Sequence, residues 1–228
     1  TAVSQAPCGE RFVVAGIDKH SSTEALRVAE EYAKAGGCMV RVRIPRRMSP
    51  IEIKAYFLSV TQGSPVPVVV IHQTFTGVPA APPDLIGELV SLDNVFGYIT
   101  DHDIRFEGRV RIYAPEDKKF WICNGGLLLA GAAMGANGTC MWLGNIAPAI
   151  CRDIVALGYD GRVAEARPLQ RMASRMDGLI GQHGVAGVKA ALGLLGFEGI
   201  ASRHPRSELG RGDVDQIRSV LAQAGLLG

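Results

Sequence analysis

Apolar residues gather in six short runs along the first two thirds of the chain, and segments with the spacing of amphipathic helices separate them. The runs are rich in β-branched residues and predict strands at Phe12–Ala15, Cys38–Ile44, Pro67–Ile71, Val95–Thr100, Phe120–Cys123 and Thr139–Leu143. Their first residues lie 26, 29, 28, 25 and 19 positions apart, which leaves room for a crossover between parallel strands. The pattern therefore predicts a repeated βα architecture.

Several of the segments between the strands begin with recognisable helix-start signals. A capping box at Ser21–Glu24 opens a helix that runs to about Lys34, and Ser49-Pro50 and Pro83-Asp84 open two more. A weaker helix pattern covers Asp103–Tyr113. After the last strand we expect helices alone, at Ile146–Leu157, Gly161–Gln182, Val185–Leu195 and Asp213–Ala224. A helical region therefore follows the βα part.

Two architectures fit this order of elements: an open, doubly wound sheet with a helical appendage, and a (β/α) barrel. In both, ligands bind at the carboxyl ends of the strands. The candidate binding residues are therefore those that follow a strand, and they include Lys19, Arg46, Arg47, His72, Asp101, Asn124 and Gly125.

Composition narrows the class of protein. The chain has 228 residues, of which 47% are apolar, 20% are charged and 28 are glycine, and its net charge is +2. These values predict a buried parallel sheet and give no general attraction to nucleic acid or anionic membranes. The uncharged stretch Phe120–Cys151 contains six glycines and Pro148, so it indicates buried sheet and turns rather than a membrane span.

The cysteines favour a reducing compartment. There are five of them, an odd number, and no C-x-x-C pair occurs. The first nine residues also lack a basic segment followed by an apolar one, so no signal peptide is predicted. We therefore expect a cytoplasmic protein that has neither a disulfide framework nor a zinc site.

Several segments, in order, resemble the dihydrodipicolinate synthase / N-acetylneuraminate lyase family of class I aldolases. They are Val66–Val70 with Thr76-Gly77, Asn94–Gly97, Phe120–Gly125, Gly138–Asn145 with Pro148, and the tail segments Val188–Leu192 and Ile217–Leu227. The resemblance covers the chain from about Arg11 onward. It implies a TIM (β/α)8-type barrel, a small carboxylate or keto acid as ligand, no cofactor, and a homo-oligomer, either a dimer or a tetramer.

The chain departs from this family at two residues that carry its chemistry. The position of the family's Schiff-base lysine falls on Ile99, and that of its acid/base tyrosine falls on Ile71, or on His72 after a shift of one residue. A Schiff base needs an amine nucleophile, which isoleucine lacks. Of the six lysines, Lys19 alone is predicted to reach the ligand-binding end, and it does so from a loop.

The chain is also short for the barrel that the resemblance implies. Such a barrel takes about 250 residues, and here about six βα units are predicted, beginning at about the third strand of the family barrel. Residues 1–145 would form the barrel portion, and residues 146–228 the last barrel helix and a C-terminal helical extension. Either the sequence is part of a longer chain, or the barrel stays open, or a partner completes it.

The remaining polar residues each allow two interpretations. Arg46 and Arg47 suit an anion or simply a solvated loop, and in the resembled family this loop carries a hydroxyl of the proton relay. His72 is a base or a hydrogen-bonded strand-end histidine. Asn124-Gly125 form an anion-binding helix start or a tight turn. Because adjacent residues of an extended segment point apart, Asp101 and His102 cannot easily share an ion, and we expect no metal site.

Three hypotheses on function follow. The chain is a divergent family member that binds a small carboxylic acid without the usual Schiff base, or serves as a non-catalytic partner of an active relative. Alternatively, it is a lyase, aldolase or hydratase that acts on a small keto acid, with His72 or Asp101 as base and Arg46 and Arg47 holding an anion. As a third alternative, it is an assembly subunit that a partner chain completes.

Overall fold

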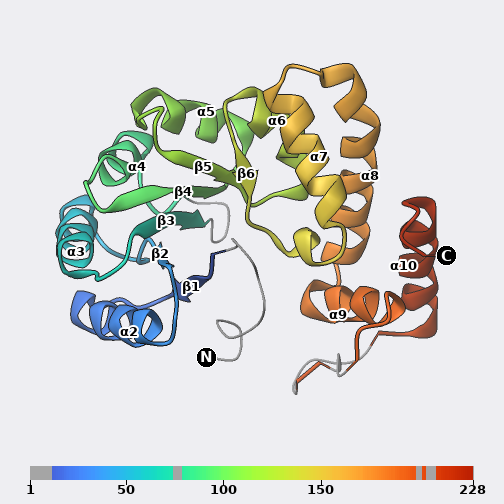
Figure 1. Ribbon diagram of the computed structural model, residues 1–228, viewed down its shortest axis with the longest axis horizontal. Coiled ribbons are helices and arrows are strands. Elements are labelled where there is room, and N and C mark those ends of the chain that lie inside the picture. The colour runs from blue at the N-terminus through green and yellow to red at the C-terminus, as the bar shows by residue number, and fades with distance from the viewer. Residues whose placement is uncertain (1–11, 74–78, 199–201, 204–208, 228) are drawn as a thin grey trace. The chain divides into compact units, whose positions relative to one another are not determined.

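The computed structural model describes residues 12–73, 79–198, 202–203 and 209–227 (Figure 1). The chain divides into two compact units, residues 1–121 and residues 122–228.

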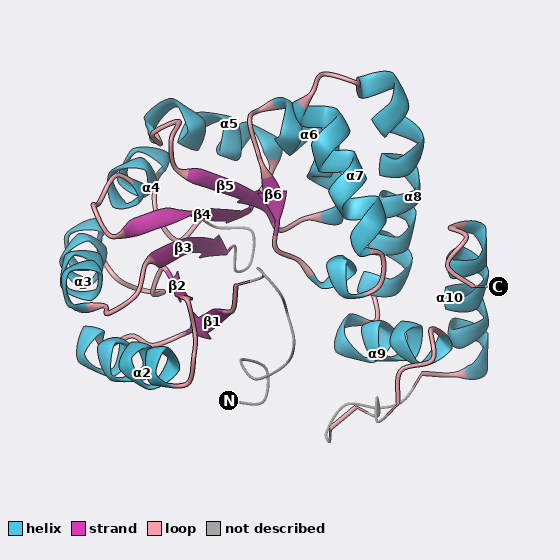
Figure 2. Ribbon diagram, viewed as in Figure 1, coloured by secondary structure: helices cyan, strands magenta, loops and turns pink. Residues whose placement is uncertain are grey.

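The first unit is a βα repeat. Its strands are β1 (Val14–Ile17), β2 (Met39–Arg43), β3 (Val68–Gln73), β4 (Val95–Asp101) and most of β5 (Lys119–Ile122). The helices between them are α2 (Ser22–Lys34), α3 (Pro50–Gly63), α4 (Pro83–Val90) and α5 (Ile104–Tyr113). Strands β1 to β4 pair in parallel, each with the next along the chain, and Figure 2 shows α2 to α5 along one side of them.

The order of the strands decides between the two predicted architectures. They follow one another as β1-β2-β3-β4-β5-β6, with no reversal. A doubly wound sheet reverses its order at a switch point, whereas a (β/α) barrel adds its strands in sequence. The prediction of a barrel-type fold with about six βα-type strands and C-terminal helices is confirmed.

Side-chain caps explain why three of the helices begin where they do. The Glu24 N–H donates to the Ser21 hydroxyl at 3.5 Å, which is one of the two hydrogen bonds of the predicted capping box. At α3, the Ser49 N–H and the Ser49 hydroxyl both donate to Glu52 Oε2, at 2.6 and 2.7 Å. These two bonds lower the pKa of Glu52. At α5, Asp103 Oδ1 accepts from two backbone N–H groups, at 2.9 and 3.1 Å. These caps fix the loops that follow the carboxyl ends of the strands.

The second unit holds strand β6 (Gly138–Thr139) and mainly helical structure. Its elements are η1 (Gly125–Leu127), α6 (Leu128–Ala133), η2 (Trp142–Asn145), α7 (Pro148–Tyr159), α8 (Val163–Gly181), α9 (Gly184–Leu194) and α10 (Arg211–Gln223). Helix α7 packs against both α6 and α8 (Figure 1). In the described part of the chain, no helix is long and apolar enough to cross a membrane.

The last strand is shorter than predicted. Thr139 Oγ1 and the Cys140 N–H both donate to the Ile122 carbonyl, at 2.8 and 2.9 Å, and they hold β6 beside the end of β5. The chain then turns into η2, where Leu143 is fully buried. The prediction of a strand through Leu143 is wrong because an apolar run suits a buried helical turn as well as a strand.

Candidate functional site

Two arginines of β2 stand on the face of the strand that points away from the helices. Val40 and Val42 are completely buried, and Arg41 and Arg43 alternate with them and keep 22% and 23% of their side chains exposed. Because successive side chains of a strand point to opposite faces, the two guanidinium groups share one face. This face and the carboxyl ends of its strands form the candidate site.

The pairing register places two isoleucines on the same face. Arg43 lies opposite Ile71 of β3, and Ile71 lies opposite Ile99 of β4. The residues that follow and precede these isoleucines, His72 and Tyr98, contact α5, so both isoleucines point the other way. Ile71 is 3% exposed and Ile99 is completely buried. The positions expected for the family's tyrosine and lysine are therefore adjacent, apolar and closed to solvent.

One carboxylate serves both arginines of β2. Asp18, directly after β1, has its Oδ1 at 3.1 Å from Arg43 Nε and at 3.5 Å from Arg41 Nη2. The pKa of Arg46 is lowered, first by desolvation and then by the charge of Arg43, while Asp18 acts in the opposite direction. The cluster of Asp18, Arg41, Arg43 and Arg46 therefore carries an excess of positive charge that suits an anion.

Gly16 makes space for this cluster. It lies opposite Arg41 in the register of β1 and β2, and a Cβ on Gly16 would lie 2.5 Å from Arg41 Nη2. Any larger residue would displace the Arg41 guanidinium. The absence of a side chain at this position therefore lets the guanidinium lie over β1.

The predicted loop residues lie around this cluster. Arg46 is half-buried, and Arg47 is exposed with a φ of 58°, a left-handed conformation that non-glycine residues seldom adopt. The Lys19 carbonyl accepts a hydrogen bond from the Tyr56 hydroxyl of α3 at 2.9 Å. Desolvation, together with the charge of Asp18, raises the pKa of Tyr56 to about 12.

His72 lies on the opposite face of the sheet, in the layer beneath α5. Its ring stacks on His102 at 5.8 Å and lies tilted against Phe106 at 5.1 Å, measured between ring centroids. It is completely buried, and neither ring nitrogen has a hydrogen-bond partner among the described residues. Desolvation, followed by the charge of His102, lowers the pKa of His72 to about 4. The structure therefore does not bring His72 to the face that carries Arg43.

Asp101 is the last residue of β4, but its side chain lies outside the described residues, as do Thr76 and Gly77. Among the side chains that the structure describes, no group of three His, Cys, Asp or Glu residues is placed to hold a metal ion. The roles predicted for Asp101 therefore stay predictions.

The turn at Asn124 and Gly125 belongs to the second unit and is held by internal hydrogen bonds. Asn124 Oδ1 accepts the Gly126 N–H at 2.9 Å, and Gln170 Nε2 donates to the Gly125 carbonyl at 2.8 Å. A Cβ on Gly125 would lie 2.7 Å from Asp177 Cγ, and burial raises the pKa of Asp177. The tight fit against Asp177 accounts for the glycine, and the anion-binding role predicted here stays a prediction.

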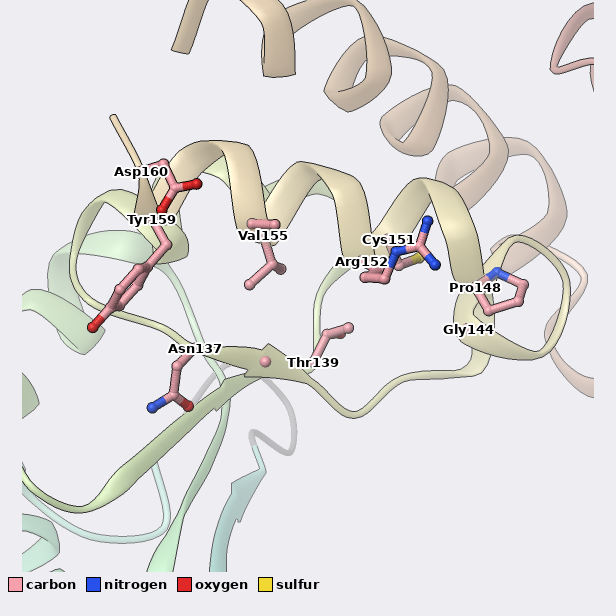
Figure 3. Close-up of a pocket in the computed structure, with 11 residues that line it drawn as sticks. Asn137, Thr139, Gly144, Pro148, Cys151, Arg152, Val155, Tyr159 and Asp160 are labelled. Carbon is pink, nitrogen blue, oxygen red and sulfur yellow. The ribbon is translucent and has the colours of Figure 1, made fainter. Parts of the chain in front are cut away.

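A hollow of about 620 Å³ lies between β6 and α7 in the second unit (Figure 3). Val155 and Tyr159 point from α7 toward β6, and Thr139, Pro148 and Cys151 also line the hollow. Burial, with the charge of Asp177 as a second cause, raises the pKa of the Cys151 thiol to about 11. The thiol therefore stays protonated near neutral pH and is a poor nucleophile.

Comparison with known proteins identifies the family. The Dihydrodipicolinate synthetase family matches residues 3–224, which is nearly the whole chain. The chain belongs to this family. Its fold is accordingly the TIM-barrel-like fold of the family, of which six strands are present in the described residues.

The relatives include one protein named as a lyase and one named as a synthase. The chain is 30% identical over 230 residues to N-acetylneuraminate lyase of Rhizobium meliloti, covering 96% of this chain and 74% of that protein. It is 29% identical over 221 residues to 4-hydroxy-tetrahydrodipicolinate synthase of Rhodopseudomonas palustris, covering 94% of this chain and 74% of that protein.

Solved structures agree on the fold. Dihydrodipicolinate synthase of Thermotoga maritima is similar with a TM-score of 0.87 and 23% identity, over 96% of this chain and 77% of that one. A prophage protein of E. coli K12 from the same family, solved in complex with pyruvate, is similar with a TM-score of 0.84 and 19% identity, over 95% and 76% of the two chains.

The family-specific fold was thus predicted correctly, whereas the arginines of β2 were missed. The signal for them was the alternation Met39-Val40-Arg41-Val42-Arg43, in which every second residue is buried and the others are larger and often charged. This run was interpreted as an apolar strand buried on both faces, and the arginines were sought only in the loop after it.

Proposed function

We propose that this member of the dihydrodipicolinate synthetase family binds a small carboxylic acid and forms no Schiff base at the usual position. The observation that carries the proposal is the pair Ile71 and Ile99, which lie side by side, buried, on the face that also bears Arg41 and Arg43. Ile99 offers no amine, and no solvent-accessible space reaches it.

Three lysines of the first unit do not offer the placement that the missing amine needs. Lys118 Nζ donates to the carbonyls of Leu92 and Val95, at 3.2 and 2.7 Å, where β4 begins, at the end of the sheet opposite the site. Lys54 forms an ion pair with Glu88 between neighbouring helices. Lys19 follows β1 on a loop and is only partly buried, whereas a nucleophilic lysine needs a rigid and desolvated placement.

The ligand class rests on charge and on the relatives. An excess of guanidinium groups on one face favours an anion, and their planar forks suit a carboxylate. The E. coli prophage protein was solved with pyruvate bound, which is a small keto acid. Pyruvate is therefore the first ligand to test, with acetate as the acid that lacks a ketone.

The test is equilibrium binding on the intact chain, measured by isothermal titration calorimetry or by ligand-observed NMR. We expect saturable and reversible binding of both pyruvate and acetate, because the carboxylate rather than the ketone is recognised. If neither pyruvate nor acetate binds, the proposal is overturned. Binding of pyruvate alone, accompanied by a covalent adduct, would also overturn it and would indicate a lysine-dependent lyase.

The hollow beside β6 favours a second candidate, an assembly subunit. Strand β6 is the last in the strand order of the described residues, and the hollow separates it from α7, whose Tyr159 is 60% exposed. A strand edge beside an apolar hollow can pair with another chain. Sedimentation velocity over a range of concentrations tests this candidate, which predicts a homo-oligomer that Tyr159→Asp weakens.

A further inference from the structure

We infer that Arg41 and Arg43 of β2, rather than the loop residues Arg46 and Arg47, form the primary binding site for the carboxylate of a small acid. This inference rests on the proposed function and assigns its binding groups. The site then lies over β1 and β2, displaced from the buried isoleucines Ile71 and Ile99.

Rigid placement distinguishes the two strand arginines from the two loop arginines. Arg41 and Arg43 are two residues apart on a strand that pairs with β1 on one side and β3 on the other. Arg46 and Arg47 follow in a turn. Binding is stronger when the groups that make it are ordered beforehand, because less conformational entropy is lost on association.

Partial burial makes the strand arginines both reachable and effective. About four fifths of each side chain is covered, since 22% and 23% remain exposed. Charge-assisted hydrogen bonds are stronger where water is partly excluded. Gly16, which is exposed, has no side chain that would cover the Arg41 guanidinium or push it aside.

Asp18 shows that a carboxylate fits between the two guanidinium groups. One of its oxygens, Oδ1, lies 3.1 Å from Arg43 Nε and 3.5 Å from Arg41 Nη2, and 48% of the Asp18 side chain is exposed. Two guanidinium groups present ten N–H donors in total, far more than one carboxylate uses. An external carboxylate can therefore join Asp18 at this site or displace it toward solvent.

The presence of Asp18 gives the site a specific signature. Because Asp18 competes as an attached carboxylate, its removal exposes both arginines and adds one positive charge. We expect Asp18→Asn to raise the affinity for acetate and pyruvate several-fold. A structural salt bridge without a ligand role would give the opposite result, namely lower stability and no gain in binding.

The experiment measures acetate and pyruvate binding by titration calorimetry on the intact chain and its variants. We expect Arg43→Gln and Arg41→Gln each to weaken binding about ten-fold or more, as the loss of a charge-assisted hydrogen bond does. Arg46→Gln and Arg47→Gln should weaken it less. Arg27→Gln removes the same charge from the exposed face of α2 and serves as the matched control. Circular dichroism verifies that each variant is folded.

The outcomes separate the inference from the proposed function. If Arg46→Gln or Arg47→Gln abolishes binding while Arg43→Gln leaves it intact, the acid binds at the loop, and the inference fails while the proposed function stands. If the wild-type chain and Asp18→Asn both fail to bind any acid, the proposed function fails. If Arg43→Gln does not fold, the affinity of Asp18→Asn for acetate and pyruvate still tests the inference. An affinity no higher than that of the wild type overturns it. Inorganic phosphate is titrated in parallel, and tighter binding of phosphate than of acetate would overturn the assignment to a carboxylate.

Discussion

The buried imidazole of His72 makes the stability of the first unit depend on pH. Its pKa is about 4 in the folded protein, against an ordinary value of 6.5, because burial disfavours the charged form. Protons therefore bind the unfolded chain before they bind the folded one as pH falls. The contribution of neutral His72 to stability is fully present above pH 6.5 and is lost as the pH falls toward 4.

The size of the effect follows from the difference between the two pKa values. A difference of 2.5 units corresponds to about 3 kcal/mol when the pH has fallen below both values. Between pH 8 and pH 5 the expected loss of unfolding free energy through His72 is about 2 kcal/mol.

Urea unfolding at pH 8 and pH 5, followed by circular dichroism and tryptophan fluorescence, measures this loss. His72→Phe keeps an aromatic ring against Phe106 but cannot be protonated. We expect the variant to lose about 2 kcal/mol less than the wild type over this interval, because the carboxyl groups common to both contribute equally. His20→Gln, which removes an exposed histidine, is the matched control and should behave as the wild type does. Equal losses in wild type and His72→Phe would refute the reasoning.

Three further results are expected. Gly16→Ala places a Cβ 2.5 Å from Arg41 Nη2, so it should displace that guanidinium and weaken acetate binding several-fold in calorimetry without unfolding the protein; unchanged affinity would contradict the placement of Arg41 in the site. Ser49→Ala removes the capping box of α3 and should lower the free energy of unfolding by about 1 kcal/mol in a urea titration, whereas no loss would show that the cap is dispensable. Cys151 is buried with a pKa of about 11, so at pH 8 iodoacetamide should alkylate it far more slowly than the exposed Cys38, and peptide mapping that finds equal rates would contradict this burial.

Local signals in the sequence were sufficient to predict most elements of the fold. The N-cap at Ser21 and the capping box at Ser49 act within four residues, so the pattern of side chains alone places the helix starts. The order of the strands was not accessible in this way, because it depends on pairing between residues that are far apart in the chain. That order, and the family match, decided in favour of the barrel.

The site was harder to predict, for a reason that lies in the pleat of the strands. Ile71 and His72 are neighbours, and sequence alone does not say which of them faces the helices. The contact of His72 with Phe106 settles this and turns Ile71 toward the face of Arg43. A shift of one residue in the register would have exchanged their roles.

Arg43 was missed because strands of a parallel sheet are usually apolar on both faces, so its run was interpreted as buried throughout. The structure instead leaves one face of β2 partly open, and the ion pair with Asp18 becomes visible only when the loop after β1 is placed beside β2. Such a contact between separate βα units has no local signal in the sequence.

Borohydride reduction in the presence of pyruvate, read by intact mass spectrometry, is the most direct test of the proposal that this chain binds an acid without covalent chemistry. A pyruvate-dependent class I aldolase, treated in the same way, verifies that trapping works. Because we place the apolar and buried Ile99 at the position expected for the family's lysine, we expect the mass of the wild-type chain to stay unchanged at pyruvate concentrations that saturate binding. A gain equal to one reduced pyruvate, on Lys19 or any other lysine, would contradict the proposal.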